Sequence, residues 1–254
     1  MCTRCISPAA VGPTLSRRSF CQATAVLGAL ATRPAVAAEG LLEPTLRLRG
    51  PATPGTKRVA LTLDACPGGF DRRIASYLAD DGVPATIFLT SAWIRRNPAG
   101  LAFLLDHRDL FAFENHGGRH LPPVLGDRSI YGLRAAGTLD AIRREVETGA
   151  ADIRRATGTQ TRWYRGATGL YSPAAIKAIE AMGFGIGGYS LNADMGASLP
   201  AATVASRVEA ARDGDVIVCH LTQPKRPSGL GIVAGVKALR LQGTVFTHLD
   251  APAA

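Results

Sequence analysis

Short β-rich runs alternate with longer helical patterns along most of this chain, and the alternation limits the folds available to it. Two parallel strands need a crossover between them, which a helix usually provides. The pattern therefore predicts an α/β fold with a parallel sheet, which either closes into an incomplete β/α barrel or stays open as a doubly wound sheet. The seven candidate strands cover residues 58–64, 85–90, 110–114, 161–165, 184–190, 216–220 and 244–248.

Several expected helices have residues suited to helix ends. Asn97-Pro98 and Ser172-Pro173 each place a capping residue before a proline in the first turn. The longest helical pattern runs from about residue 138 to 157, with apolar residues at helical spacing and with arginines and acids on the other face.

The first 38 residues have the features of an export signal. Arg17 and Arg18 form a twin-arginine pattern, an apolar run follows at residues 23–31, and small residues at Ala35 and Ala37 suit a signal peptidase. The apolar run is too short to anchor the protein in a bilayer. We therefore expect a twin-arginine signal peptide over 1–38, an extended lead-in over 39–57 and one domain over 58–250 in a periplasmic or secreted protein without a stable membrane anchor.

The charge of the chain does not indicate a nucleic-acid partner. The net charge is +9, and residues 1–38 hold four arginines and no acid, so it falls to +5 without them. No basic stripe is interleaved with aromatic residues, and the export signal argues against such a partner as well. A mild positive charge suits an anionic polymer of the cell envelope.

Two of the five histidines, His116 and His120, lie four residues apart, shortly after an apolar run that ends at Phe113. Gly117 and Gly118 stand between them, which favours a loop over a helix. Imidazole is the commonest protein ligand for a borderline metal ion, and two imidazoles from one short segment can hold the same ion. This segment therefore predicts a metal site, as against a glycine-rich loop that carries two solvated histidines.

Further polar side chains stand at the ends of candidate strands. Asp64 ends the first strand, Arg165 the fourth and His220 the sixth, whereas His116 and Asp194 follow the third and the fifth. The carboxyl ends of the strands carry the active site in β/α barrels. We therefore expect these five side chains to converge.

Five segments hold these residues in a fixed order. They are Thr62-Leu63-Asp64-Ala65-Cys66, His116 to His120, Arg165-Gly166-Ala167-Thr168-Gly169, Asn192-Ala193-Asp194 and Val218-Cys219-His220. In this order they resemble the Thr-Phe-Asp-Asp-Gly, His-x-x-x-His, Arg-Pro-Pro-Tyr-Gly, acidic and strand-end histidine motifs of the polysaccharide deacetylases, the NodB-homology group of carbohydrate esterases. The resemblance spans residues 58–249 and implies a distorted (β/α)7 barrel.

The resemblance also implies a hydrolase that removes acetyl groups from an N- or O-acetylated glycan, including peptidoglycan-type polymers. Its expected cofactor is a divalent metal ion, in the first place Zn²⁺, which polarises the acetyl carbonyl and lowers the pKa of bound water from 15.7 toward about 7. A carboxylate takes the proton of the water, and a second group protonates the departing amine or alkoxide. By resemblance, His220 is that acid and is paired with an acidic residue, and Arg165 keeps a carboxylate ionised.

The first motif departs from the family pattern. The family presents two adjacent acids, a general base and then a metal ligand, whereas this chain has Asp64 followed by Ala65. Either Asp64 is the base and the metal lacks its carboxylate, or Asp64 joins His116 and His120 as the third ligand. In the second case another acid is the base, with Asp194 preferred over the other two candidates, Asp71 and Glu114. We expect Asp64 at the metal, because two neutral imidazoles alone would hold zinc poorly.

Only two cysteines, Cys66 and Cys219, remain once residues 1–38 are removed. An even number in an oxidising compartment favours a disulfide. Such a bond would brace Asp64 against His220. Free thiols and metal ligation are the alternatives.

Two other functions fit the same residues. Ala65 is compatible with a glycan-binding protein of this fold that has lost its chemistry. A metal-dependent amidase acting on a small non-sugar amide is the other, because relatives of the resembled fold hydrolyse such bonds. Only two tryptophans, Trp93 and Trp163, are available to stack on sugar rings, so the sequence barely discriminates a polymer from a small substrate.

Overall fold

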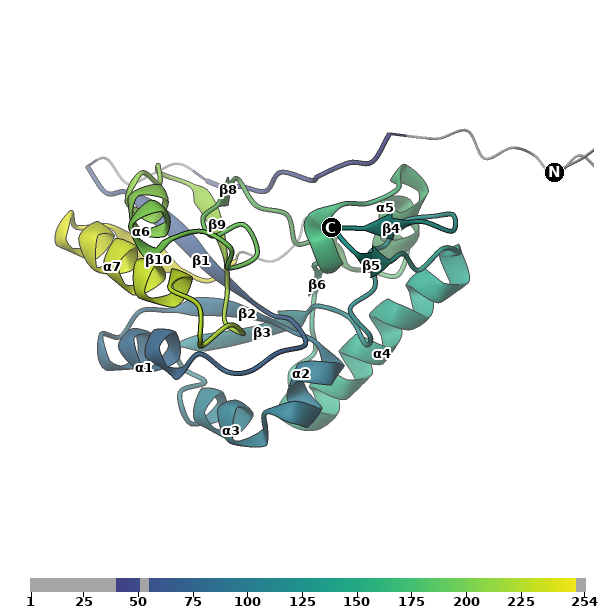
Figure 1. Ribbon diagram of the computed structural model, residues 1–254, viewed down its shortest axis with the longest axis horizontal. Helices are drawn as coiled ribbons and strands as arrows, with labels where there is room; N and C mark the ends of the chain where they lie inside the picture. The colour runs from purple at the N-terminus through teal and green to yellow at the C-terminus, as the bar shows by residue number, and fades with distance from the viewer. Residues whose placement is uncertain (1–39, 51–54, 250–254) are drawn as a thin grey trace, which may run out of the picture. The chain divides into compact units, whose positions relative to one another are not determined.

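The computed structural model describes residues 40–50 and 55–249 (Figure 1). The expected signal peptide, residues 1–38, lies outside the described residues. The main sheet has eight strands, all paired in parallel, in the order β7-β6-β3-β2-β1-β9-β8, with β10 paired to β1. These strands are β1 (Arg58–Ala65), β2 (Ala85–Leu89), β3 (Phe111–Asn115), β6 (Trp163–Tyr164), β7 (Gly185–Ile186), β8 (Leu191–Asn192), β9 (Asp215–His220) and β10 (Val245–Thr247).

The helices connect successive strands and lie on the outside of the sheet (Figure 1). A small antiparallel hairpin, β4 and β5, precedes the longest helix. The bounds are α1 (Arg72–Asp80), α2 (Ser91–Arg96), α3 (Pro98–Asp106), β4 (Ser129–Ile130), β5 (Leu133–Arg134), α4 (Leu139–Thr157), the 3₁₀ turn η1 (Ala167–Gly169), α5 (Pro173–Glu180), α6 (Ala201–Glu209) and α7 (Ser228–Leu241).

The sheet curls into a distorted β/α barrel, as the resemblance implies. Strands β7 and β8 stand at the two ends of the strand order although only residues 187–190 separate them in sequence. The chain between them therefore joins the two edges of the sheet. The strand expected at 184–190 is shorter in the structure, where β7 ends at Ile186 and β8 begins only at Leu191. Between them, the backbone carbonyls of Gly187 and Gly188 accept hydrogen bonds from the Arg165 side chain.

Helix α4 matches the expected pattern over 138–157. The side chain of Thr138 caps it by accepting a hydrogen bond from the backbone N–H of Ala141, and Gly158 ends it at φ 77°. The sequence pattern places the acids of this helix on the face away from its apolar residues, but one acid does not follow it. Glu145 is buried beside Val146.

The core lies between the sheet and its helices. Every residue of β1 after Arg58 is buried, and β2 is buried throughout, as is typical of strands covered on both faces. A second apolar cluster lies beneath α4 and α5, and its members are Ile142, Val146, Tyr164, Tyr171, Ala175 and Ile179.

The lead-in segment, defined here as residues 40–49, runs along the barrel in an extended conformation. Leu42 and Tyr171 exchange two backbone hydrogen bonds of 2.9 Å. Farther along, Arg47 forms an ion pair of 2.6 Å with Asp215 at the start of β9. This segment therefore contacts both the loop before α5 and the start of β9.

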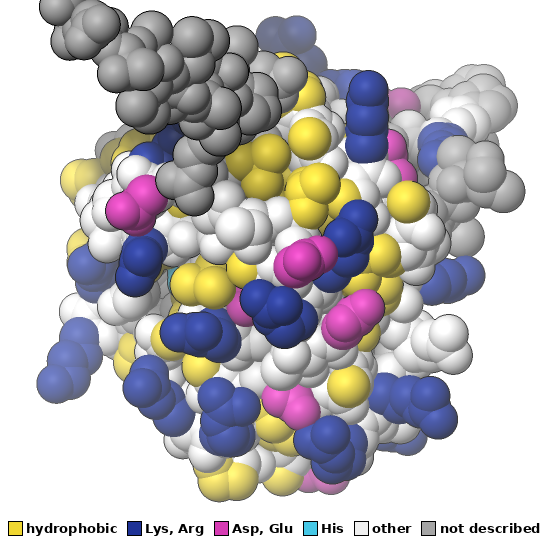
Figure 2. Space-filling model, turned by 90° about the vertical axis from the view of Figure 1, so that its right-hand side faces the viewer, with side chains coloured by type: hydrophobic (Ala, Val, Ile, Leu, Met, Phe, Trp, Pro, Cys, Tyr) yellow, Lys and Arg dark blue, Asp and Glu magenta, His cyan; other side chains and the backbone are white. Residues whose placement is uncertain are grey.

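On the face shown in Figure 2, lysine and arginine side chains are interspersed with acidic and apolar ones. Among the described helices, none is long and apolar enough to cross a membrane.

Candidate active site

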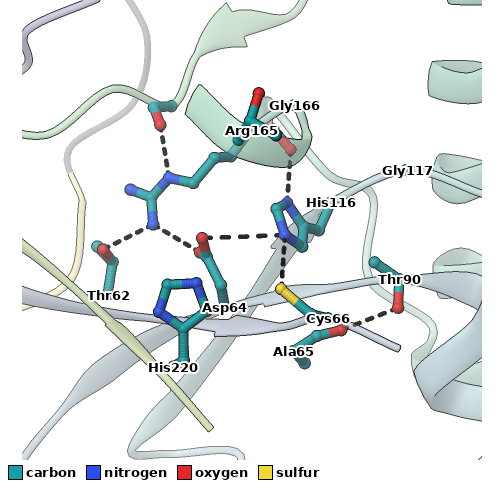
Figure 3. Close-up of polar contacts among 12 residues, drawn as sticks. Thr62, Asp64, Ala65, Cys66, Thr90, His116, Gly117, Arg165, Gly166 and His220 are labelled. Atoms are coloured by element: carbon teal, nitrogen blue, oxygen red, sulfur yellow. Dashed lines mark hydrogen bonds and ion pairs between the residues drawn. The ribbon is translucent and has the colours of Figure 1, made fainter. Parts of the chain in front are cut away.

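Asp64 and Arg165 form a buried ion pair inside the barrel. The Arg165 Nη1 donates to Asp64 Oδ1 at 2.8 Å and to the Thr62 hydroxyl at 2.8 Å (Figure 3). Burial opposes ionisation of Asp64, but the charge and hydrogen bond of Arg165, together with the neighbouring His116 and His220, outweigh it, and the pKa of this carboxyl is lowered. Asp64 therefore carries a negative charge at neutral pH.

The Arg165 guanidinium is held on every side. Its Nε donates to the Gly187 carbonyl at 2.6 Å and its Nη2 to the Gly188 carbonyl at 3.1 Å, while its Cζ lies 4.0 Å from the centre of the Phe88 ring. With 1% of its surface exposed, this side chain has no freedom to swing away from Asp64. Arg165 thus orients the Asp64 carboxylate and also binds residues 187–190, the chain between the edge strands β7 and β8, which we call the seam of the barrel.

His220 and Asp194 form a second charged pair. Because β1 and β9 are neighbours, Asp64 and His220 are partners in the strand register, and their side chains point to the same face. His220 Nδ1 lies 2.8 Å from Asp194 Oδ1, and the His220 backbone N–H donates to Asp194 Oδ2 at 2.7 Å. Burial disfavours the imidazolium, but the Asp194 carboxylate raises the pKa of His220 well above its ordinary value.

The paired histidines meet a cysteine. The donor atoms of Cys66, His116 and His120 lie within 4.8 Å of one another. His116 Nδ1 is 2.7 Å from the Arg165 carbonyl, which can only accept, so Nδ1 carries a proton and Nε2 is the ring nitrogen that faces Cys66 and Asp64. That nitrogen lies 3.4 Å from the Cys66 sulfur and 3.9 Å from Asp64 Oδ2 (Figure 3).

The Cys66 thiol is the most perturbed group among these donors. Burial favours its neutral form, but His116, with smaller contributions from His120 and His220, holds the pKa of the Cys66 thiol well below its usual range. A thiolate beside two imidazoles is a donor set suited to zinc.

A buried acid that the motifs did not reveal supports the His120 loop. The Glu145 carboxylate accepts hydrogen bonds from the backbone N–H groups of Arg119, at 2.8 and 3.0 Å, and of Leu121, at 3.1 Å. These residues flank His120, which adopts the left-handed conformation at φ 64°. In sequence, Glu145 is one of several acids on a long helix, so nothing distinguished it.

The other candidate bases are engaged elsewhere. Asp71 caps α1 and binds Arg73 at 2.6 Å. Glu114 accepts hydrogen bonds from the backbone N–H groups of Arg162 and Trp163, and burial nevertheless raises its pKa to about 7.

The two histidines outside the motifs make local contacts. His107 Nδ1 lies 2.9 Å from the Phe103 carbonyl, and His248 Nε2 lies 2.9 Å from the Leu110 carbonyl.

The expectation of a disulfide is wrong, because Cys66 and Cys219 are both free. Cys66 follows the end of β1 and faces His116, whereas Cys219 is a buried residue of β9. Side chains alternate along a strand, so Cys219 points to the face opposite His220. Burial raises the pKa of the Cys219 thiol well above its usual range, which keeps it neutral.

Taken together, these residues bring a carboxylate, a histidine–aspartate pair and three potential metal donors to one site. An ionised carboxylate and a charged imidazole stand side by side, and a cluster of metal donors lies next to the carboxylate (Figure 3).

Comparison with known proteins identifies a matching family and solved structures of similar fold. Residues 52–187, more than half of the chain, match the family model of polysaccharide deacetylases. No curated protein matches the sequence.

Several solved structures share the fold at low sequence identity. A pseudoenzyme of carbohydrate esterase family 4 from Bacillus anthracis aligns with a TM-score of 0.59 and 21% identity over 76% of this chain and 64% of that protein. This chain therefore covers less than two thirds of the length of that protein. A peptidoglycan N-acetylglucosamine deacetylase aligns with a TM-score of 0.63 and 22% identity over 76% of this chain and 86% of that one. A family 4 carbohydrate esterase from Streptomyces lividans, in complex with acetate, aligns with a TM-score of 0.61 and 18% identity, over 78% and 98% respectively.

Proposed function

The chain belongs to the polysaccharide deacetylase family, and from this premise we propose that it is a metal-dependent hydrolase that removes acetyl groups from an acetylated glycan. The observation that carries the proposal is the pairing of opposite charges at neighbouring strand ends. Asp64 is bound to Arg165 on one side, and His220 is bound to Asp194 on the other. A base and an acid of this kind are what acyl transfer to water requires.

His116 and His120 would hold the metal ion. The ring proton of His116 is committed to the Arg165 carbonyl, so its Nε2 is available as a ligand. A divalent ion bound there would supply Lewis-acid polarisation of the acetyl carbonyl and would make a water molecule more acidic. The imidazole and thiol donors of this cluster favour Zn²⁺ among the common divalent ions.

Asp64 is assigned as the general base rather than as a metal ligand. Its Oδ1 is bound to Arg165, which keeps the carboxylate ionised and fixes its orientation. The other oxygen, Oδ2, faces His116 and is free to accept the proton of the attacking water. This assignment reverses the sequence-based preference for Asp64 at the metal.

His220 is assigned as the general acid. Its Nδ1 is held by Asp194, so the opposite ring nitrogen, Nε2, is the one that can donate a proton to the leaving amine or alkoxide. Asp194 stabilises the charged ring and orients it, and is therefore a positioning residue.

An acetylated glycan is the proposed substrate because solved relatives of this fold include a peptidoglycan N-acetylglucosamine deacetylase. The tryptophans do not help to select a sugar, since Trp93 and Trp163 are 0% and 6% exposed. Their burial leaves the small-amide alternative standing. Export by the twin-arginine route to the periplasm also stays a prediction of the sequence.

The test is acetate release by the zinc-loaded protein from N-acetylglucosamine oligomers, peptidoglycan and O-acetylated xylan. We expect release from at least one glycan. The substitution Asp64→Asn should lower kcat by about 10²–10⁴-fold, the usual contribution of a general base, while the bound zinc stays at the wild-type level.

Two results would change the assignment. Loss of zinc from Asp64→Asn would return Asp64 to the metal. A zinc-loaded wild-type protein that binds glycans without releasing acetate would support the non-catalytic alternative, which Ala65 in the first motif specifically favours. Acetate release only from small amides would support the amidase.

A further inference from the structure

The side chain of Cys66 lies where a third metal ligand is needed. Its sulfur is 3.4 Å from His116 Nε2 (Figure 3). The three donor atoms of Cys66, His116 and His120 lie within 4.8 Å of one another. The three residues come from two loops, one after β1 and one after β3. Among the described residues, this is the one group of His, Cys, Asp and Glu side chains that meets as a cluster of three donors.

The neighbours of Cys66 in sequence cannot take this place. Ala65 offers only a methyl group, and it is fully buried in the apolar core. Asp64 has one carboxylate oxygen bound to the Arg165 guanidinium, at 2.8 Å, and Arg165 is itself held by three further contacts to Thr62, Gly187 and Gly188. Turning Asp64 to a metal would leave the buried Arg165 without its counter-ion, which is costly.

We propose that the thiolate of Cys66, and not a carboxylate, completes the metal site with His116 and His120. The proposal rests on the metal-dependent function proposed above. Binding would form a sulfur–metal bond and release to solvent the proton that Cys66 and His116 share, leaving one positive charge on a divalent ion and at least one coordination position open.

A thiolate ligand has a consequence that a carboxylate ligand would not have. Sulfur selects zinc and cobalt over the hard ions magnesium and manganese, which prefer oxygen. The protein should therefore bind Zn²⁺ and Co²⁺ tightly and Mn²⁺ poorly. Ligation by Cys66 also leaves Asp64 free for proton transfer, so the single acid of the first motif does not have to act as both base and metal ligand.

The test is the absorption spectrum of the protein with Co²⁺ in place of the native ion, measured on the chain from residue 39 onward. We expect a thiolate-to-cobalt charge-transfer band in the near ultraviolet that saturates at one Co²⁺ per chain. The band should disappear in Cys66→Ser and Cys66→Asp, and should persist in Asp64→Asn and in the matched control Cys219→Ala, which removes the other described cysteine.

Metal affinity, measured by competition with a chelator, gives a second readout. Cys66→Ser should bind Zn²⁺ at least about 100-fold more weakly, because even outer-shell partners of a metal site are worth 10–100-fold. Cys66→Asp should keep a bound metal and shift the preference toward Mn²⁺.

The outcomes separate this proposal from the proposed function. Cys66 is not a ligand if the wild type binds one Co²⁺ per chain without showing the band, even if acetate is released. An unchanged band in Cys66→Ser would overturn the ligand as well. The band without acetate release from any glycan would overturn the deacetylase activity and leave the Cys66 ligand in place.

Discussion

At the scale of single residues, Arg165 holds several parts of the site in place. Its guanidinium binds Asp64 and Thr62 inside the barrel, its Nε and Nη2 bind the carbonyls at the seam, and its own backbone carbonyl fixes the ring of His116. A lysine could not replace it, because a single ammonium group cannot make contacts in these separate directions. The orientation of Asp64, the orientation of His116 and the closure of the barrel therefore depend on the same side chain.

The His220–Asp194 pair sets the pH range of the proposed reaction. Burial alone would lower the pKa of His220, but the Asp194 carboxylate raises it well above the usual value. The imidazole thus stays protonated above about pH 6.5, where a free histidine loses its proton. We expect the alkaline limb of kcat/KM in the wild-type protein to lie above that pH.

Replacing Asp194 with Asn removes the charge that supports the imidazolium. The alkaline limb should move to lower pH by at least about one unit, since one unit corresponds to about 1.4 kcal/mol and an adjacent buried charge is worth that much or more. The pair also stabilises the fold fully below about pH 6.5 and loses this contribution as the pH rises through the folded-state pKa of His220.

A pH–rate profile and thermal unfolding between pH 5 and 9 would check both effects. Asp140→Asn, at an exposed i,i+3 ion pair with Arg143, is the matched control and should change neither. An unmoved alkaline limb in Asp194→Asn would show that His220 is not the group reported by that limb.

At the scale of elements, helix α4 positions the loop that carries His116 and His120. The carbonyls of Glu145 and Val146 accept hydrogen bonds from Gly118 N and from the Asn115 side chain, at 3.0 and 2.8 Å. Gly149 allows this approach, because a Cβ there would lie 2.2 Å from Asn115 Oδ1 and 2.8 Å from the Gly117 carbonyl carbon. The glycine weakens the helix and permits the contact.

The substitution Gly149→Ala separates these two effects. Alanine would favour the isolated helix by about 1 kcal/mol, but the clash should dominate and lower the free energy of unfolding by roughly 1–3 kcal/mol. Zinc affinity should fall too, because the loop that carries His116 must shift. Chemical denaturation and chelator competition measure the two quantities.

The control on the same helix is Glu147→Ala, an exposed position, which should stay within about 0.5 kcal/mol of the wild type. If Gly149→Ala is as stable as the wild type and binds zinc equally well, the close approach of α4 does not hold the loop.

At the scale of the whole barrel, the lead-in segment reinforces the seam. Besides its hydrogen bonds to Tyr171 and Gly214, it passes so close to the break between β7 and β8 that a Cβ on Gly188 would lie 2.2 Å from the Pro44 carbonyl oxygen. Tyr189, at the same break, donates a hydrogen bond to Glu43. The lead-in therefore covers the place where the sheet has no continuous strand.

Removing residues 1–50 should lower the stability of the barrel, whereas removing residues 1–38 should not. The shorter chain loses three backbone hydrogen bonds and the Arg47–Asp215 ion pair, worth roughly 2–4 kcal/mol together. For a domain of this size the melting temperature should fall by roughly 4–15 °C. Calorimetry on both chains would measure it, and equal melting temperatures would mean that the lead-in does not support the seam.

The sequence alone determined the fold class and most of the residues at the site. The alternation of strands and helices requires a parallel sheet with crossovers, and the carboxyl ends of such strands meet at one edge. For that reason Asp64, His116, Arg165 and His220 could be placed together from their positions at strand ends.

Only the tertiary structure decided how these residues are paired. Whether Asp64 turns to Arg165 or to the metal depends on side-chain directions after the chain has curled, and the sequence-based preference for the metal had no access to them. The same holds for Cys66, which follows a strand end and can face either the core or the histidines. Its approach to His116 and His120, the burial of Glu145 behind the loop and the hydrogen bonds of Arg165 to the chain between β7 and β8 all arise from contacts between residues distant in sequence. Local patterns fix which groups reach an edge, whereas packing in three dimensions decides which of them touch.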